Sequence, residues 1–257
     1  MQTIIRRFFM LIRRASAHQI PCGVATSCAT CNNILMKEKV RPYIPLLLLA
    51  ACFALFPTVM GANARQIVID DFASGLDANW QEKSFVGNTL YRVVEDEGRT
   101  CLEALSDAAA SGLYNKIEYE PSAYPVLNWS WKIDGVVEGG DVNFKQSDDC
   151  PARIYVVFPS VLFWRTRALC YIWANKAPVG TFIPNPHVKS TMMIVVQSGE
   201  EKAGQWMEQS ADIVADFRRA FGQDPPKAGA IALMTDADNT GKQAKAWYGP
   251  ISISSGS

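Results

Sequence analysis

Residues 126–134, with the sequence VLNWSWKID, decide the fold class of this chain. Leu127, Trp129, Trp131 and Ile133 alternate with polar residues, so an extended backbone would carry one apolar and one polar face. A period of two is typical of a half-buried β-strand. Because both tryptophans share the apolar face, the pattern predicts that their indoles lie in a core.

Similar short β-favouring runs cover most of the chain after residue 65. They are separated by turn-forming segments such as Asp96-Glu97-Gly98 and Asn239-Thr240-Gly241. The predicted strands are 66–72, 90–96, 100–105, 112–119, 126–134, 153–158, 168–174, 192–197, 230–235 and 246–253. Many short strands at such spacing predict a mainly β fold, an antiparallel β-sandwich of jelly-roll type formed by residues 65–257 as a single domain.

One short helix is predicted to interrupt the strands. Apolar residues recur at helical spacing between residues 213 and 221. Ser210 or Asp212 is placed to cap the start of this helix, and Gly222 is placed to end it.

An apolar run over residues 46–60, LLLLAACFALFPTVM, is typical of a secretion signal. Basic residues precede it and Ala62-Asn63-Ala64 follows it, as a cleavage site before Arg65 would require. Since Met36 opens a signal peptide of ordinary length, we interpret residues 36–64 as the signal peptide and residues 1–35 as an upstream extension. These features predict a periplasmic or secreted protein.

The segment Leu49-Ala50-Ala51-Cys52 offers an alternative to simple cleavage, because it resembles a bacterial lipobox. A lipid anchor would then form at Cys52. A lipobox normally ends the apolar run, however, and here the run continues to Met60. We therefore expect contact with the membrane through the signal peptide rather than through a lipid anchor at Cys52.

The charge balance differs between the two parts of the chain. The whole chain has 25 basic and 25 acidic residues. Residues 1–64 contain seven of the basic and one of the acidic residues, so 25−7=18 basic and 25−1=24 acidic residues remain, a net charge of −6. An acidic domain disfavours nucleic acid and anionic lipid as partners and leaves neutral glycans, cations or cationic partners open.

Three of the seven cysteines follow residue 65, namely Cys101, Cys150 and Cys170. An oxidising compartment permits one disulfide and leaves one thiol over. Pairing of the strands 153–159 and 168–174 about their midpoint would place Cys170 opposite Val157, so Cys150 is not its direct cross-strand partner. Buried free thiols are the alternative.

Two aspartate-rich turns are the first candidate binding site. One turn precedes the strand at residues 153–158, whose polar face carries an arginine and a tyrosine. If both turns lie at the same end of the sandwich, the carboxylates surround that arginine and could bind sugar hydroxyls or Ca²⁺ through oxygen atoms. The candidate residues are Asp148, Asp149, Arg153, Tyr155, Asp236, Asp238 and Asn239, with Asp236 and Asp238 as the metal ligands.

An ordinary structural role for these turns is the competing interpretation. The segment 236–241 matches an EF-hand loop at its first, third and sixth positions, but Trp247 stands where the bidentate glutamate is needed, so an EF-hand is excluded. Aspartate, asparagine and glycine are also common turn formers that bond to neighbouring backbone. The cofactor prediction is accordingly none, with calcium as the alternative.

Two further tryptophans are candidate ligand contacts. Trp164 lies in the connection PSVLFWRTR, residues 159–167, and either folds over one end of the sandwich or is exposed to bind a ligand. Trp173 shares a strand face with Leu169 and Tyr171, so it contacts either the core or a ligand.

Several catalytic classes find no support in the sequence. His187 is the only histidine after the predicted signal peptide, which excludes a zinc site built from several histidines. No nucleophile elbow, phosphate-binding glycine motif or dinucleotide fingerprint occurs. A glycoside hydrolase or lyase that uses positioned acidic residues remains an alternative.

The stretches VLNWSWKID, SDDCPARIYVVFP, ALCYIWANK, WMEQSADIVADFRRAFG and MTDADNTGKQAKAWYGPISI together resemble an uncharacterised family of bacterial exported proteins, one of the domain-of-unknown-function families. The resemblance covers residues 67–253 and implies an architecture but no reaction. The aspartate-rich turn followed by Tyr248-Gly249 is also similar to the last strands of jelly-roll carbohydrate-binding modules.

The sequence therefore predicts an exported, non-catalytic β-sandwich that binds a glycan or another small ligand. A carbohydrate-active enzyme, hydrolase or lyase, is one alternative, and a structural cell-envelope protein is another. The expected partner is a polysaccharide or a cell-envelope component, and nucleic acid is not expected.

Overall fold

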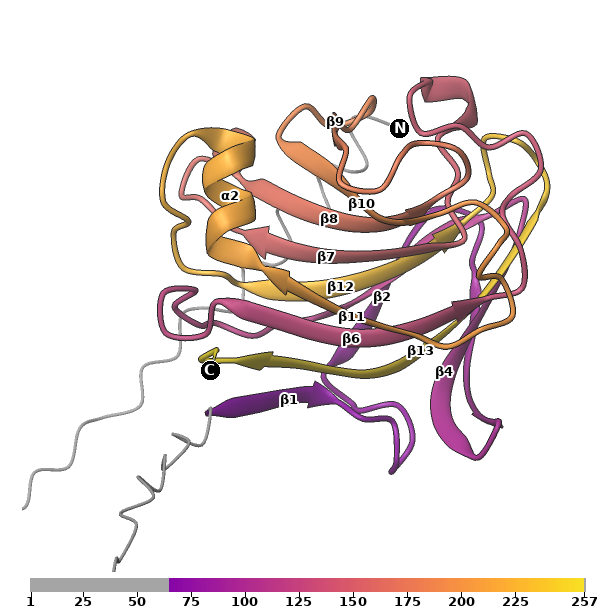
Figure 1. Cartoon of the computed structure of the whole chain (residues 1–257), viewed down its shortest axis with the longest axis horizontal. Helices are drawn as coiled ribbons and strands as arrows, with labels where there is room; N and C mark the ends of the chain where they lie inside the picture. The colour runs from indigo at the N-terminus through magenta and orange to yellow at the C-terminus, as the bar shows by residue number, and fades with distance from the viewer. Residues whose placement is uncertain (1–64, 257) are drawn as a thin grey trace, which may run out of the picture. The chain divides into compact units, whose positions relative to one another are not determined.

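The computed structural model describes residues 65–256, which form two β-sheets packed face to face (Figure 1). The first sheet has the order β11-β6-β13-β4-β3, and β1 also pairs with β13. Its strands are β1 (Gln66–Asp70), β3 (Leu90–Asp96), β4 (Arg99–Asp107), β6 (Val126–Ile133), β11 (Met207–Asp212) and β13 (Gln243–Ser254). The predicted extension and signal peptide lie outside the described residues.

The second sheet has the order β2-β5-β12-β7-β8-β10-β9. Its strands are β2 (Trp80–Val86), β5 (Ala110–Asn115), β7 (Ala152–Phe158), β8 (Arg167–Ala174), β9 (Phe182–Pro184), β10 (Thr191–Ser198) and β12 (Ala230–Asp236). All neighbouring strands in both sheets are antiparallel except β8 and β10, which are parallel. The predicted β-sandwich is confirmed.

The inner faces of the two sheets form the core, as the alternation in β6 predicts. Trp129 and Trp131 are 2% and 0% exposed, and their rings meet edge to face at 5.4 Å. Leu127 and Ile133 from the same strand belong to this core. Ring pairs of this geometry add to the stabilisation that burial of the indoles provides.

One helix, α2 (Ile213–Phe221), lies against β8 and begins where β11 ends (Figure 1). The Asp212 side chain accepts a hydrogen bond from the Ala215 N–H at 2.9 Å, as an N-cap should. Gly222 ends the helix in the left-handed conformation, with φ of 67°. Both helix boundaries match the sequence prediction.

Three strands, β2, β9 and β11, were not predicted, and each is an edge strand of its sheet. β2 and β11 consist largely of polar residues, because an edge strand needs only partial burial. The predicted hairpin register was also wrong. The strands begin one residue earlier than expected, so Phe158 pairs with Arg167 and Cys170 lies opposite Tyr155.

All three cysteines of the described residues are free and buried. Cys150 and Cys170 pack in one small apolar cluster on the outer face of the second sheet, together with Ile172 and Met193. They behave as small apolar side chains, the second of the two roles considered for them. Among residues 65–256, no helix is long and apolar enough to cross a membrane.

Candidate functional site

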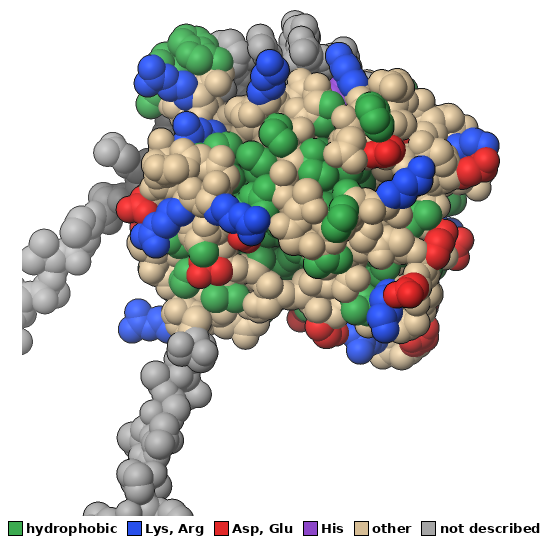
Figure 2. Space-filling model, turned by 45° about the horizontal axis from the view of Figure 1, so that its top comes forward, with side chains coloured by type: hydrophobic (Ala, Val, Ile, Leu, Met, Phe, Trp, Pro, Cys, Tyr) green, Lys and Arg blue, Asp and Glu red, His purple; other side chains and the backbone are tan. Residues whose placement is uncertain are grey.

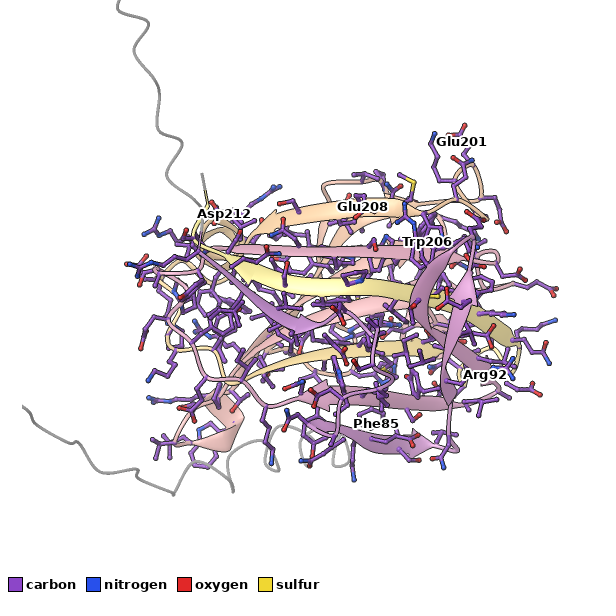
Figure 3. All side chains as sticks on the ribbon, turned by 90° about the horizontal axis from the view of Figure 1, so that it is seen from below. Phe85, Arg92, Glu201, Trp206, Glu208 and Asp212 are labelled. Atoms are coloured by element: carbon purple, nitrogen blue, oxygen red, sulfur yellow. The ribbon has the colours of Figure 1, made fainter. Side chains whose placement is uncertain are left out.

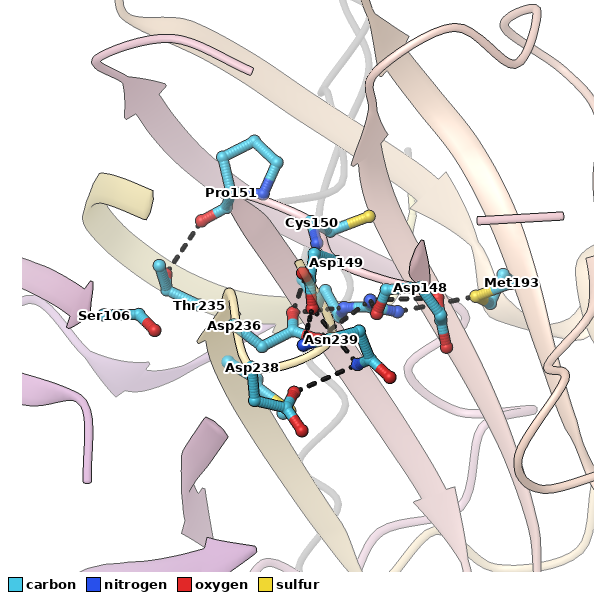
Figure 4. Close-up of polar contacts among 12 residues, drawn as sticks. Ser106, Asp148, Asp149, Cys150, Pro151, Met193, Thr235, Asp236, Asp238 and Asn239 are labelled. Carbon is cyan, nitrogen blue, oxygen red and sulfur yellow. Dashed lines mark hydrogen bonds and ion pairs between the residues drawn. The ribbon is translucent and has the colours of Figure 1, made fainter. Parts of the chain in front are cut away.

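The structure brings the two aspartate-rich turns together, with Asp148 and Asp149 beside Asp236 and Asp238 (Figure 4). Arg153 forms hydrogen bonds to both turns. Arg153 lies on the outward face of β7, opposite Met234 of β12, and Asp236 is the last residue of β12. Arg153 Nε donates to Asp236 Oδ1 at 2.7 Å and Nη2 donates to Oδ2 at 3.0 Å. Nη2 also donates to the Asp148 carbonyl at 2.8 Å and to its carboxylate at 3.0 Å.

Asp149 connects the two turns without the arginine, because its side chain bonds to the backbone of the second turn. Its carboxylate accepts hydrogen bonds from the backbone N–H of Asn239 at 3.2 Å and of Thr240 at 2.6 Å. The Asn239 side-chain amide donates to Asp149 at 3.2 Å and to Asp238 at 3.1 Å. The cluster therefore holds the turn after β12 against the segment before β7.

Burial dominates the electrostatics of this cluster. Arg153 is 1% exposed, and Asp148 and Asp236 are buried beside it. Burial raises the pKa of Asp148 and raises the pKa of Asp236 to about 8, while the positive charge of Arg153 opposes both shifts. One guanidinium neutralises one carboxylate, so the cluster retains a proton to a higher pH than an exposed aspartate does.

Carboxylate oxygens of Asp149, Asp236 and Asp238 lie within 4.8 Å of one another, as a cation site requires. Calcium needs six to eight oxygen ligands. Both oxygens of Asp236 already accept hydrogen bonds from Arg153, and both oxygens of Asp149 accept hydrogen bonds from the second turn. These residues fit a self-contained network better than a calcium site, and calcium stays a prediction.

A small cavity of about 70 Å³ adjoins the cluster on the outer face of the second sheet. Asp148, Arg153 and His187 line its polar part, and Tyr155 and Phe85 line its apolar part. His187 is 7% exposed and neither ring nitrogen forms a hydrogen bond; Nε2 lies 3.8 Å from Asp148 Oδ2. Burial lowers the pKa of this histidine. The cavity has room for a few water molecules but not for a sugar ring.

Trp173 does not contact any ligand-accessible surface. It is 0% exposed, its ring lies 6.1 Å from that of Trp131, and its Nε1 donates to the Gly199 carbonyl at 3.0 Å. Of the two roles considered for Trp173, its burial supports the contact with the core. Its side chain points to the inner face of β8, toward the first sheet, and belongs to the core.

Trp164 lies at the rim of a groove of about 970 Å³, formed where the β7–β8 connection approaches the end of α2. Its side chain is 59% exposed. Phe221 supplies further aromatic surface to the groove, whereas Phe158 and Phe217, which also line it, are 1% and 0% exposed. Volumes of 300 to 1,000 Å³ are typical of ligand pockets, so this groove has the size that the cavity beside Arg153 lacks.

Basic residues that the sequence analysis did not single out line the same groove. Arg165 and Arg167 come from the β7–β8 connection and the start of β8, and Lys189 comes from the loop before β10. The two arginines follow Trp164 closely in the sequence, which could have marked them as candidates. Lys189 and Phe221 lie far from Trp164 along the chain, so only the fold assigns them to the groove.

The outer face of the first sheet carries a second groove, of about 660 Å³. Polar side chains line it, including Asn128, Ser130 and Glu208, and its single aromatic lining residue, Trp129, is 2% exposed. Trp206 precedes β11 near Glu208 at this edge of the sheet (Figure 3), where its Nε1 donates to Asp96 at 2.8 Å. The side chains that line this groove offer hydrogen bonds, and the one ring among them is buried.

A family described as a protein of unknown function (DUF3047) matches residues 78–252 of the chain. The chain belongs to this family. The match covers both sheets except β1 and the last residues of β13. It confirms the resemblance to an uncharacterised family that the sequence motifs indicated, and the family brings no reaction with it. No curated protein matches the chain.

Solved structures similar to this DUF3047 protein include carbohydrate-binding modules. The family 11 module of the cellulosomal cellulase Lic26A-Cel5E of Clostridium thermocellum is 14% identical, with a TM-score of 0.43 over 74% of this chain and 94% of that chain. A family 29 carbohydrate-binding module is 11% identical, with a TM-score of 0.38 over 75% of this chain and 94% of that chain. Likeness at this level identifies no ligand.

Proposed function

We propose that this protein is an exported, non-catalytic glycan-binding β-sandwich whose ligand lies in the groove beside Trp164. The observation that carries the proposal is the indole of Trp164, 59% exposed at the rim of a groove of about 970 Å³. A pyranose ring presents an apolar C–H surface, which stacks on a flat aromatic face.

Hydrogen-bonding side chains and backbone surround this aromatic surface. Ser160, Ser190 and Gln223 line the groove together with the aromatic residues. Ligand sites of this kind combine apolar walls with a small number of polar groups that fix the orientation of the ligand. The groove provides both elements, whereas the cavity beside Arg153 is too small and the groove on the first sheet lacks an exposed ring.

Binding is better supported than hydrolysis. Most glycoside hydrolases place two carboxyl groups on either side of the scissile bond. No aspartate or glutamate is among the described residues that line the groove beside Trp164. Asp148 and Asp236, the carboxylates considered for such a reaction, are buried and bonded to Arg153.

Export is part of the same proposal and rests on the apolar run at residues 46–60 with its basic flank and cleavage motif. A periplasmic or extracellular location would give the groove access to envelope or environmental polysaccharides. Fractionation of cells that produce the protein, with N-terminal sequencing of the exported form, tests this part, and a protein that retains residues 1–35 in the cytoplasm would contradict it.

The test of the binding site is the substitution Trp164→Ala, measured by isothermal titration against a panel of soluble polysaccharides. Loss of one stacked ring is expected to weaken binding about tenfold, which corresponds to ~1.4 kcal/mol. Val179→Ala removes a side chain that is 62% exposed outside the groove, and this control should bind like the unmodified protein.

Three results would count against the proposal. Unchanged affinity in Trp164→Ala would move the site elsewhere on the protein. Release of reducing ends on incubation would favour the carbohydrate-active enzyme. Absence of binding across the panel would favour a structural role in the cell envelope.

A further inference from the structure

The groove beside Trp164 carries positive charge without a balancing negative charge of its own. Arg165, Arg167 and Lys189 line it, and none of its described lining residues is acidic. The rest of the folded domain is acidic, since residues 65–257 have a net charge of −6, from 18 basic and 24 acidic residues. The groove is therefore a local exception to the overall charge.

These three cations are not used in ion pairs within the described residues. Some other basic side chains have carboxylate partners, for example Arg92 with Glu103 at 2.6 Å. Arg165 and Lys189 are exposed, and neither they nor Arg167 forms a salt bridge in the described part of the chain. Like charges gathered without counter-charges repel one another, which an anionic ligand would offset.

Arg167 is held in a defined position. Its guanidinium lies over the ring of Phe221 with 4.8 Å to the ring centroid, and over that of Phe217 at 5.9 Å. Its Nη1 is buried without a hydrogen-bond partner. The N–H groups of a guanidinium lie in its own plane, so stacking on an aromatic ring leaves its edge able to form paired hydrogen bonds to a carboxylate or sulfate.

Figure 2 shows Lys and Arg side chains over the left of the visible face, the side where Figure 1 places α2, with fewer acidic side chains among them, whereas basic and acidic side chains are mixed on the right. A local excess of basic side chains raises the local concentration of an anionic partner.

We propose that the glycan bound beside Trp164 is anionic, a polysaccharide whose sugar rings carry carboxylate or sulfate groups. This inference rests on the proposed function. The indole of Trp164 stacks on a ring, and the anionic substituents pair with Arg165, Arg167 and Lys189. The overall charge of the domain disfavours anionic partners in general, and the groove supplies the exception for one that also presents a ring.

The decisive comparison is between polygalacturonate and its fully methyl-esterified form, because esterification removes the charge and keeps the sugar backbone. In isothermal titration at low ionic strength, esterification is expected to weaken binding at least about tenfold, as loss of charge-assisted hydrogen bonds implies. Dextran sulfate and dextran form a second pair that separates sulfate from carboxylate recognition. Binding to the acidic forms should weaken as salt is added.

The matching protein variant is Arg165→Gln with Lys189→Gln, since both side chains are exposed and their loss should not disturb the fold. Affinity for the acidic glycan is expected to fall about tenfold, with no change in thermal stability. Lys176→Gln with Lys202→Gln removes two exposed charges outside the groove and should leave affinity unchanged.

The outcomes distinguish this inference from the proposal on which it rests. Equal binding of the charged and esterified polymers, lost in Trp164→Ala, would overturn the charge inference and support glycan binding. Binding of duplex DNA as tight as that of polygalacturonate would overturn it as general polyanion attraction. Absence of binding to any polysaccharide would overturn both.

Discussion

Replacement of Arg153 by methionine tests whether the buried cluster stabilises the fold. Arg153→Met keeps a long unbranched side chain but removes the cation and the four hydrogen bonds to Asp148 and Asp236. Removal of one partner from a buried ion pair costs about 3–5 kcal/mol, because it leaves charge uncompensated in the interior. For a domain of this size that corresponds to a loss of about 10 °C in melting temperature.

The cost should depend on pH, and its sign follows from the raised pKa values of Asp148 and Asp236. The folded protein holds these protons more tightly than the unfolded chain does. This contribution to stability is complete below the ordinary aspartate pKa near ~4 and is lost as the pH rises through the folded-state pKa. For Asp236 the folded-state pKa is about 8.

The unmodified protein should therefore lose stability between pH 5 and pH 8, and Arg153→Met should lose more, because removal of the cation raises both carboxyl pKa values further. We expect a cost of ~1–2 kcal/mol at pH 5, where the carboxyls take up protons, and ~3–5 kcal/mol at pH 8.

Urea unfolding followed by circular dichroism at both pH values measures these costs. Arg218→Met is the control, since Arg218 pairs with Asp224 on the surface and should contribute less than about 0.5 kcal/mol. A variant that loses less than about 1 kcal/mol at pH 8, or more at pH 5 than at pH 8, would refute the account of the cluster.

Two further predictions concern other parts of the fold. Cys101, Cys150 and Cys170 should react with a thiol reagent only after unfolding, because all three are buried. Burial raises the pKa of Cys101 to about 11 and that of Cys170 to about 12. An increase in mass on reduction, which would reveal a disulfide, contradicts this prediction. Asp212→Ala should cost about 1 kcal/mol through loss of the helix cap, whereas Asp212→Asn should cost only a few tenths, and equal stability of both variants in thermal unfolding would show that the cap contributes nothing.

Local patterns were sufficient to predict much of the sandwich. The alternation in β6 predicted that Trp129 and Trp131 are buried, and the helical spacing with Asp212 and Gly222 predicted both ends of α2. The same alternation in β7 predicted that Arg153 faces away from the core. These features depend on residues a few positions apart, so they can be recognised in the sequence.

The strands β2 and β11 were not predicted, because they lie at sheet edges, where polar residues replace the apolar alternation. The role of Arg153 was not predicted for a different reason. The sequence indicated a polar outer face for β7, but the segments before β7 and after β8 cover that face and bury the arginine to 1% exposure.

By itself, the sequence determined the fold class, the helix, the core tryptophans and the residue types of the two aspartate-rich turns. The tertiary structure decided that the turns meet in a closed ion-pair network, and that Trp164 shares a groove with Lys189 and Phe221. The physical reason is the range of the interactions. Periodicity and capping act between near neighbours in the chain, whereas a groove forms where segments separated by tens of residues pack together.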